Sequence, residues 1–292
     1  MSEKKIVRIE KDRYKAVRDY LVSGRRTFYE RHCGSSKSIL YEGKEFMYVD
    51  YEKNKGSGHH LSKMVLGDVR RWVCANGIEK INYDGFPYVE QMFNLNSIER
   101  VIGEPIVAID INDCYWVTAY KLGYISYRTY ISGRRKKEWK VGRNASIGRL
   151  CSVEVIDAYI KGSLDKSLRQ CIRQPEEFIA IRNSIVSHVF KNFYRLYKEI
   201  GDVFYMFLTD CVFTEYNKFK YVKKFFNDAG YDVKAKAVEF IRLDRDLNTI
   251  HWFDFEAGFK DGKDRRSKYY TYTDSQLVES VKENMLKHGK SI

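Results

Sequence analysis

Apolar residues recur along this chain with two different periods, and together they predict an α+β fold. Spacings of three to four residues predict helices over residues 12–22, 59–73, 117–122, 147–169, 176–200, 217–229 and 274–288. Shorter apolar or alternating runs predict strands over residues 38–51, 106–110, 203–208, 211–215, 232–242, 249–259 and 269–272. The two kinds of element are intermixed along the chain.

The strand predicted at residues 106–110 ends in a carboxylate, Asp110. Such an aspartate either caps a turn or helix or holds a metal ion over the edge of a sheet. A second aspartate, Asp210, occupies the tight turn between the apolar runs 203–208 and 211–215. Because two-metal phosphoryl-transfer sites need carboxylates from neighbouring strands, this pair favours the metal-binding interpretation.

Composition adds a preference for polyanionic partners. The 292 residues include 52 Lys and Arg against 39 Asp and Glu, for a net charge of +13, together with 23 Tyr and 17 Phe. Basic charge attracts nucleic acid, and exposed aromatic rings can stack on unpaired bases. No apolar run is long enough for a membrane span, and the charged N-terminus is not a signal peptide, so we expect a cytoplasmic protein without membrane contacts.

The six cysteines are scattered and form no Cys-x-x-Cys pair, so we expect reduced thiols rather than a zinc site or disulfides. A basic run between residues 133 and 149 is interrupted by glycines. Its charged members are Arg134, Arg135, Lys136, Lys137, Lys140, Arg143 and Arg149. Either it is a solvated hairpin or loop, or it is a flexible arm that contacts DNA phosphates.

Four short motifs, in order, resemble those of family B DNA polymerases. Asp110-Ile-Asn-Asp-Cys-Tyr115-Trp is similar to motif A, Asp-x-Asn-Ser-Leu-Tyr-Pro. Asn183-Ser184 resembles the Asn-Ser of motif B, and Phe207-Leu-Thr-Asp210-Cys-Val-Phe resembles motif C, Tyr-Gly-Asp-Thr-Asp-Ser. Lys268-Tyr-Tyr270 is similar to the Lys-x-Tyr that follows motif C. The resemblance covers roughly residues 101–275.

The resemblance implies a role for each matching residue. Asp110 and Asp210, with the backbone carbonyl of Ile111, would bind Mg²⁺ or Mn²⁺. Tyr115 would lie under the sugar and exclude a 2′-hydroxyl, and Lys268 with Tyr270 would hold the primer strand. The residues expected to contact the incoming deoxynucleoside triphosphate are Asn112, Asp113, Cys114, Tyr115, Arg173, Arg182 and Asn183.

The chain also departs from the family pattern. Leu208 replaces the first motif C aspartate, and Ile179 stands where motif B has its lysine. Arg182, Arg173, Arg169 or Arg149 would then have to bind the triphosphate. No Asp-x-Glu of a proofreading exonuclease occurs in the first part of the chain. Asp254-Phe-Glu256 has that spelling, but its position favours a solvated strand face over an accessory carboxylate pair near the site.

These observations predict a polymerase-type palm, with an antiparallel sheet backed by helices, at residues 101–145 and 201–262. A small N-terminal α+β region of unknown role would occupy residues 1–100, a two-helix fingers-like insertion 146–200, and a reduced thumb-like segment 263–292. The predicted function is metal-dependent addition of deoxynucleotides to a DNA 3′ end. A primase-like or template-independent transferase, and a non-catalytic nucleic-acid-binding protein on a degenerate palm, remain open as alternatives. The small size is typical of a viral or mobile-element protein.

Overall fold

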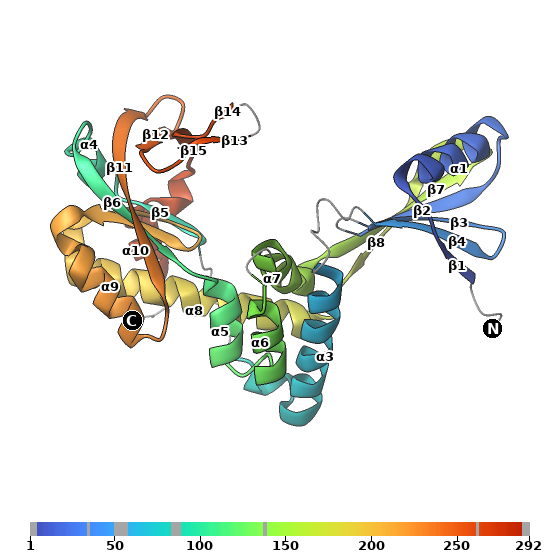
Figure 1. Ribbon diagram of the computed structural model, residues 1–292, viewed down its shortest axis with the longest axis horizontal. Helices are drawn as coiled ribbons and strands as arrows, with labels where there is room; N and C mark the ends of the chain where they lie inside the picture. The colour runs from blue at the N-terminus through green and yellow to red at the C-terminus, as the bar shows by residue number, and fades with distance from the viewer. Residues whose placement is uncertain are drawn as a thin grey trace. The chain divides into compact units, whose positions relative to one another are not determined.

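The computed structural model describes residues 5–33, 36–49, 58–82, 89–136, 139–260 and 263–287, and it has an α+β fold (Figure 1). The chain divides into two compact units, and each unit is built from two separate segments. Unit 1 comprises Met1–Ile81 and Tyr120–Arg182, and unit 2 comprises Asn82–Ala119 and Asn183–Ile292. The chain therefore passes from one unit to the other three times.

Unit 1 contains a six-stranded sheet in the order β1-β4-β3-β2-β7-β8. Its strands are β1 (Lys5–Arg8), β2 (Phe28–Cys33), β3 (Ser36–Tyr41), β4 (Lys44–Val49), β7 (Val153–Ile160) and β8 (Ser163–Arg173). All neighbouring strands are antiparallel except β1 and β4, which are parallel. Helix α1 (Lys11–Ser23) packs on one face, where Leu21, Phe28 and Ile39 are buried in a shared core.

The remaining helices of unit 1 pack on one another. They are α3 (Gly58–Asn76), α6 (Tyr127–Arg134) and α7 (Lys140–Gly148), with short 3-10 turns at Ile78–Lys80 and Arg149–Cys151. Asp68 of α3 accepts a hydrogen bond of 2.8 Å from the backbone N–H of Ser126, the residue that caps α6. This contact fixes the start of α6 against α3.

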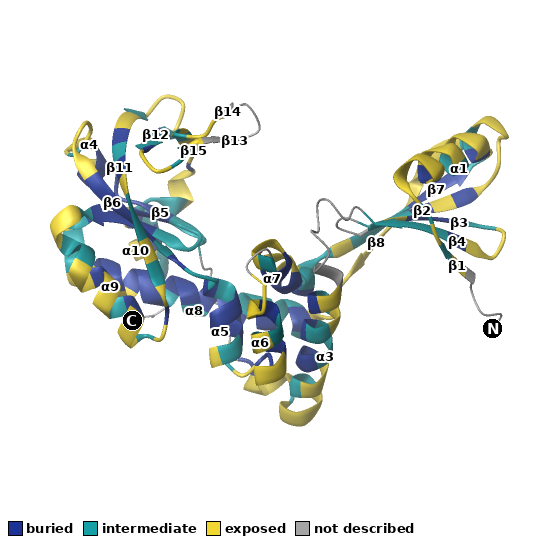
Figure 2. Cartoon of the chain, in the orientation of Figure 1, coloured by how far each residue is buried: buried dark blue, intermediate teal, exposed yellow. Residues whose placement is uncertain are grey.

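Unit 2 is organised around a seven-stranded antiparallel sheet in the order β15-β12-β11-β6-β10-β9-β5. Its strands are β5 (Gln91–Phe93), β6 (Pro105–Ile111), β9 (Phe204–Leu208), β10 (Cys211–Glu215), β11 (Val233–Asp244), β12 (Thr249–Asp254) and β15 (Ser267–Thr271). A separate two-stranded ribbon joins β13 (Phe259–Lys260) to β14 (Lys263–Asp264). The central strand β6 is buried along most of its length, because it is paired on both sides (Figure 2).

Most helices of unit 2 cover one face of this sheet, whereas the short α4 (Leu95–Glu99) packs on the other face, where Leu95 and Ile98 join Ala108 and Phe213 in a core. The other helices in unit 2 are part of α5 (Cys114–Lys121), the second part of α8 (Glu176–Ile200), α9 (Phe219–Asp228) and α10 (Val278–Lys287), with 3-10 turns at Gly201–Val203, Tyr216–Lys218 and Asp274–Gln276. Phe193 of α8 stacks on Phe207 of β9 with ring centroids 4.7 Å apart, and Phe226 of α9 meets the same Phe193 edge-on. Phe207 shares its face of the sheet with Val212 and Ile109, so this is the helix-backed face.

The structure confirms the α+β class and the antiparallel sheet backed by helices, but it corrects several local predictions. The helix predicted at residues 147–169 is wrong, because β7 and β8 form a hairpin there. The loop predicted for the basic run is also wrong, since most of it lies in α6 and α7. The unit boundaries differ from those expected: β5 and α4 belong to unit 2, and β15 of the expected C-terminal segment is paired into its sheet. In the described part of the chain, no helix is both long and apolar enough to cross a membrane.

Candidate active site

The strand register of unit 2 brings the two predicted metal-binding aspartates to the same end of the sheet. Cys211 of β10 lies directly opposite Asp110 of β6, and Asp210 is the residue before Cys211. The backbone N–H of Ile111 donates a hydrogen bond of 2.7 Å to the carbonyl of Asp210. Two residues that are 100 positions apart in sequence are therefore joined through their immediate neighbours.

The turn that carries Asp210 is tightly held. Thr209 has a left-handed backbone conformation with φ of 56°, which few β-branched residues adopt. Its N–H donates to the carbonyl of Glu90 at 2.8 Å, and the N–H of Asp210 donates to the carbonyl of Leu208 at 2.6 Å. The tight turn predicted at Thr209 and Asp210 is thus confirmed.

Tyr115 reaches the same turn from the other side. Asp113 takes a left-handed conformation, with φ of 53°, at the start of helix α5. In the first turn of α5, the Tyr115 hydroxyl donates to the carbonyl of Thr209 at 3.2 Å. The backbone N–H of Asn112 donates to the carbonyl of Asp232 at 2.8 Å, and Cys114 is buried. The segment after β6 therefore lies beside the aspartate-bearing turn.

Three charged residues extend the site along the face opposite α8 and α9. Asp254 is almost completely buried at 2% exposure, at the end of β12. Its Oδ2 accepts bonds from Lys236 Nζ at 2.8 Å and from Lys268 Nζ at 2.6 Å. The side chain of Lys236 lies on the same face of the sheet as those of Ala108 and Asp110. Lys236 of β11 pairs with Ala108 of β6, and residues two apart on a strand, such as Ala108 and Asp110, share a face. We call Lys236, Asp254 and Lys268 the lysine–aspartate cluster.

Both aspartates and both lysines lie close enough to the Cys211 thiol to shift its pKa. Burial raises this pKa, and the negative charges of Asp110 and Asp210 raise it further, whereas Lys236 and Lys268 lower it. Burial alone would lower the pKa of Lys236, but its hydrogen bond to Asp254 and the negative charges of Asp254 and Asp110 together leave the pKa raised. Lys236 is therefore charged at neutral pH, and both aspartates and both lysines act on one point of the sheet.

The donor set suits Mg²⁺ in its chemistry. Magnesium is commonly held by one or two carboxylates and completes its shell with substrate phosphates and water. Asp110 and Asp210 supply two carboxylates, both only partly exposed. No cluster of three or more His, Cys, Asp or Glu side chains suited to a metal occurs among the residues that the structure describes.

The other predicted site residues divide between the two units. Asn183 belongs to unit 2, on α8, and the hydroxyl of its neighbour Ser184 donates to the carbonyl of Asn82 at 2.8 Å. Tyr270 lies two residues after Lys268 and packs its ring on Phe93, with centroids 5.4 Å apart. The basic residues predicted to bind triphosphate or DNA that fall in unit 1 are Arg134, Arg135, Lys136, Arg149, Arg169, Arg173 and Arg182. Lys137 lies outside the described residues.

The basic run is more engaged with its own unit than the sequence predicts. The Arg134 guanidinium lies over the Tyr130 ring and donates to its hydroxyl at 2.6 Å, and Lys136 lies over Trp139. Arg143 is buried and donates to the carbonyl of Gly133 at 2.7 Å. At least Arg143 therefore supports the helix pair rather than forming part of an arm.

Two residues of the cluster differ from the sequence-based prediction. Lys236 is not among the predicted site residues, although its alternation with Lys234 on a predicted strand indicates that both share a face. Asp254 was expected on a solvated strand face, and this is wrong because its carboxylate is buried between two lysines. Glu256 lies beyond the end of β12, so the two carboxylates are not a pair on one strand.

Comparisons with known proteins give no relative for this chain. No family model matches it, and neither a curated protein nor a solved structure does.

Proposed function

We propose that the chain is a metal-dependent nucleotidyltransferase that adds deoxynucleotides to a DNA 3′ end. The observation that carries this proposal is the pairing of Cys211 with Asp110, which sets Asp110 and Asp210 at one end of an antiparallel sheet. That placement is what two-metal phosphoryl transfer requires. The motif resemblance, the net charge of +13 and the lysines beside the aspartates support the same reading.

In this mechanism Asp110 and Asp210 would hold magnesium, with the Ile111 carbonyl as a further ligand. The bound metal would supply positive charge that favours ionisation of the attacking 3′-hydroxyl and neutralises the phosphates. Lys268 and Lys236 provide positive charge for the DNA backbone beside the reacting ends. Tyr115 fills the space beside the aspartate-bearing turn and disfavours a ribose 2′-hydroxyl.

The test is incorporation of labelled deoxynucleotides with Mg²⁺ or Mn²⁺, on primed and unprimed templates. Asp110→Asn and Asp210→Asn keep the side-chain size but remove the charge, and each should reduce incorporation by at least a hundredfold. Asp202→Asn is the matched control, because Asp202 is 85% exposed in the same unit. Full activity in either site variant would refute the assignment.

The same assay separates the related functions. Extension that requires a primer supports a polymerase, and synthesis on an unprimed template supports a primase-like enzyme. Salt-sensitive DNA binding by a folded chain that incorporates nothing, with either metal, would replace the enzymatic proposal by a binding function.

A further inference from the structure

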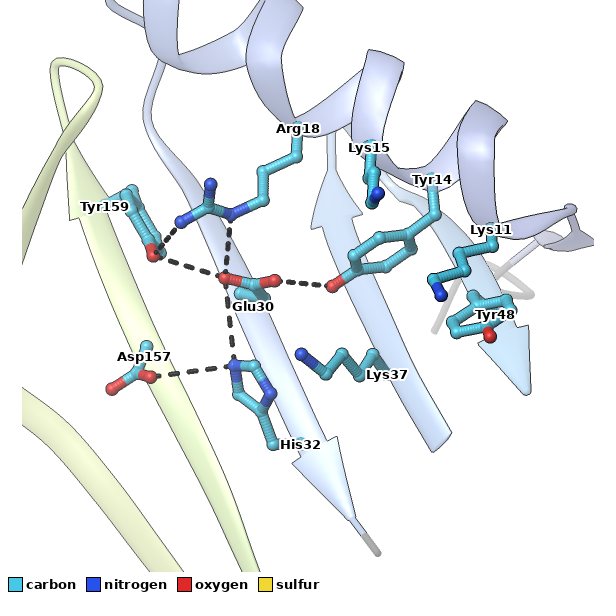
Figure 3. A pocket seen from close by; sticks show the side chains of 10 residues that line it. All are labelled: Lys11, Tyr14, Lys15, Arg18, Glu30, His32, Lys37, Tyr48, Asp157 and Tyr159. Atoms are coloured by element: carbon cyan, nitrogen blue, oxygen red, sulfur yellow. Dashed lines mark hydrogen bonds and ion pairs between the residues drawn. The ribbon is translucent and has the colours of Figure 1, made fainter. Parts of the chain in front are cut away.

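Unit 1 has a second polar site, in the space between helix α1 and the sheet (Figure 3). One half of the sheet face under α1 is apolar, where Phe28, Ile39 and Tyr159 join the core. Along the same strands the face becomes polar: Glu30 and then His32 follow Phe28 on β2, and Asp157 lies opposite Glu30 on β7. Here the helix and the sheet enclose a cavity of about 520 Å³. This volume is within the range of small-molecule sites, roughly 300–1,000 Å³.

The floor of this cavity is a rigid hydrogen-bonded network. Glu30 is buried and accepts bonds from the Tyr14 hydroxyl at 2.6 Å and from Arg18 Nε at 3.3 Å. Tyr159 bridges the same two groups, because it accepts from Arg18 Nη2 at 2.9 Å and donates to Glu30 at 3.2 Å. Burial would raise the pKa of Glu30, but the hydrogen bonds from Tyr14 and Arg18 and the positive charges of Arg18 and His32 together lower it, so the carboxylate stays ionised.

The rim of the cavity carries cations that this network does not use. Lys11 and Lys15 are one turn apart on α1, and Lys37 faces them from β3. Figure 3 shows that these three ammonium groups take part in none of the bonds and ion pairs among the residues that line the cavity. A helix normally turns apolar residues toward a sheet, so a stripe of basic residues in this position is unusual. The rim therefore carries positive charge that no ion pair among the lining residues neutralises.

An aromatic side chain completes the cavity. Tyr48 lies directly across the strand pair from Lys37, so both side chains emerge on the same face. Its ring is half-buried and 5.9 Å from the ring of Tyr14. Lysine ammonium groups beside a partly exposed aromatic ring form the combination that binds phosphates and stacks on bases.

We propose that this cavity binds the phosphate and base of a nucleotide, either free or at a position in single-stranded nucleic acid. Lys11, Lys15 and Lys37 hold the phosphate at the rim, Tyr48 contacts the base, and Glu30 keeps Arg18 and the two tyrosines in place below. The carboxylates Glu30 and Asp157 keep the phosphate away from the floor. The proposal uses none of the residues of the candidate active site.

The test measures binding of four probes to the full chain by calorimetry: deoxyadenosine monophosphate, deoxyadenosine, inorganic phosphate and a five-nucleotide single strand. The monophosphate or the strand should bind, and deoxyadenosine should bind at least tenfold more weakly than the monophosphate. Lys15→Ala combined with Lys37→Ala should weaken binding at least tenfold. For the single strand, the slope of the logarithm of the binding constant against the logarithm of the salt concentration should become shallower by about 1.4. Tyr48→Leu should weaken binding of the monophosphate but not binding of inorganic phosphate.

Lys166→Ala is the matched control, since Lys166 is an exposed lysine of the same unit outside the cavity. Much tighter binding of the strand than of the monophosphate assigns the cavity to single strands, and equal binding assigns it to mononucleotides. Unchanged binding by a folded double variant, an equal loss in Lys166→Ala, or no binding of any probe would overturn the proposal. The binding test requires no nucleotide incorporation, so failure of the proposed enzymatic function is read separately.

Discussion

Asp254 offers the sharpest test of the lysine–aspartate cluster. Replacing it with Asn keeps the Oδ1 acceptor for the backbone N–H groups of Glu256 and Ala257, both at 3.2 Å. The substitution removes only the negative charge and sets an amide against Lys236 and Lys268. Two ammonium groups then remain close together without a counter-charge.

The magnitude follows from burial. Removing one partner of a fully buried ion pair costs about 3–5 kcal/mol. The lysine side chains are 29% and 34% exposed, so water screens part of their charge. We therefore expect Asp254→Asn to lower the free energy of unfolding of unit 2 by about 1–3 kcal/mol.

The assay is urea denaturation followed by circular dichroism and tryptophan fluorescence, with Trp252 on the same strand as a local reporter. Asp264→Asn is the control, because Asp264 makes an exposed ion pair with Arg266, and its loss should leave the unfolding free energy unchanged. The reasoning fails if Asp254→Asn is as stable as the parent chain, or if the control costs as much.

Three further predictions use other parts of the molecule. The pKa values of Glu30 and Asp254 are lowered on folding despite burial, so the stability that these ionised carboxylates contribute is complete above their unfolded pKa values near 4. This contribution should be lost as the pH drops through the lower folded pKa values. Glu30→Gln should therefore make the loss of unfolding free energy with falling pH less steep. Gly162→Ala should destabilise unit 1 by about 2 kcal/mol or more, since φ is 78° and the new methyl group would meet the Val22 carbonyl at 2.3 Å. Gly43 has a similar φ of 73° but open space around it, so Gly43→Ala should cost only about 1 kcal/mol. Equal losses of stability in thermal melts would contradict the steric argument. Tyr115→Ala should raise incorporation of ribonucleotides relative to deoxynucleotides at least tenfold, and unchanged sugar selection would remove Tyr115 as the gate.

The sequence predicts the centre of unit 2 because its signals are local. Two apolar runs on either side of Thr209 and Asp210 can form little besides a hairpin, and the apolar run before Asp110 requires partners on both sides. The sequence does not predict the hairpin of β7 and β8, and the reason is equally local. Val153, Ile156 and Ile160 are spaced by three and four residues, which fits a helix as well as it fits this partly exposed strand.

The cavity in unit 1 could not be predicted in the same way. Its lining comes from α1, β2, β3, β4 and β7, and only the strand register brings Asp157 opposite Glu30 and Tyr48 opposite Lys37. Asp254 shows the same limit, because its burial depends on lysines 18 and 14 residues away on two other strands.

The placement of β6 between β10 and β11 has a consequence for how the protein is made. About 100 residues separate the end of β6 from the start of β10, and β11 follows later still. At about 5–20 residues per second, a ribosome needs roughly 5–20 s to supply the first partner. During that interval the nascent chain carries an apolar strand with both edges unpaired, which is a template for aggregation. We therefore expect a chaperone that covers extended apolar segments to raise the yield of folded protein, and a chain cut before β10 to be insoluble.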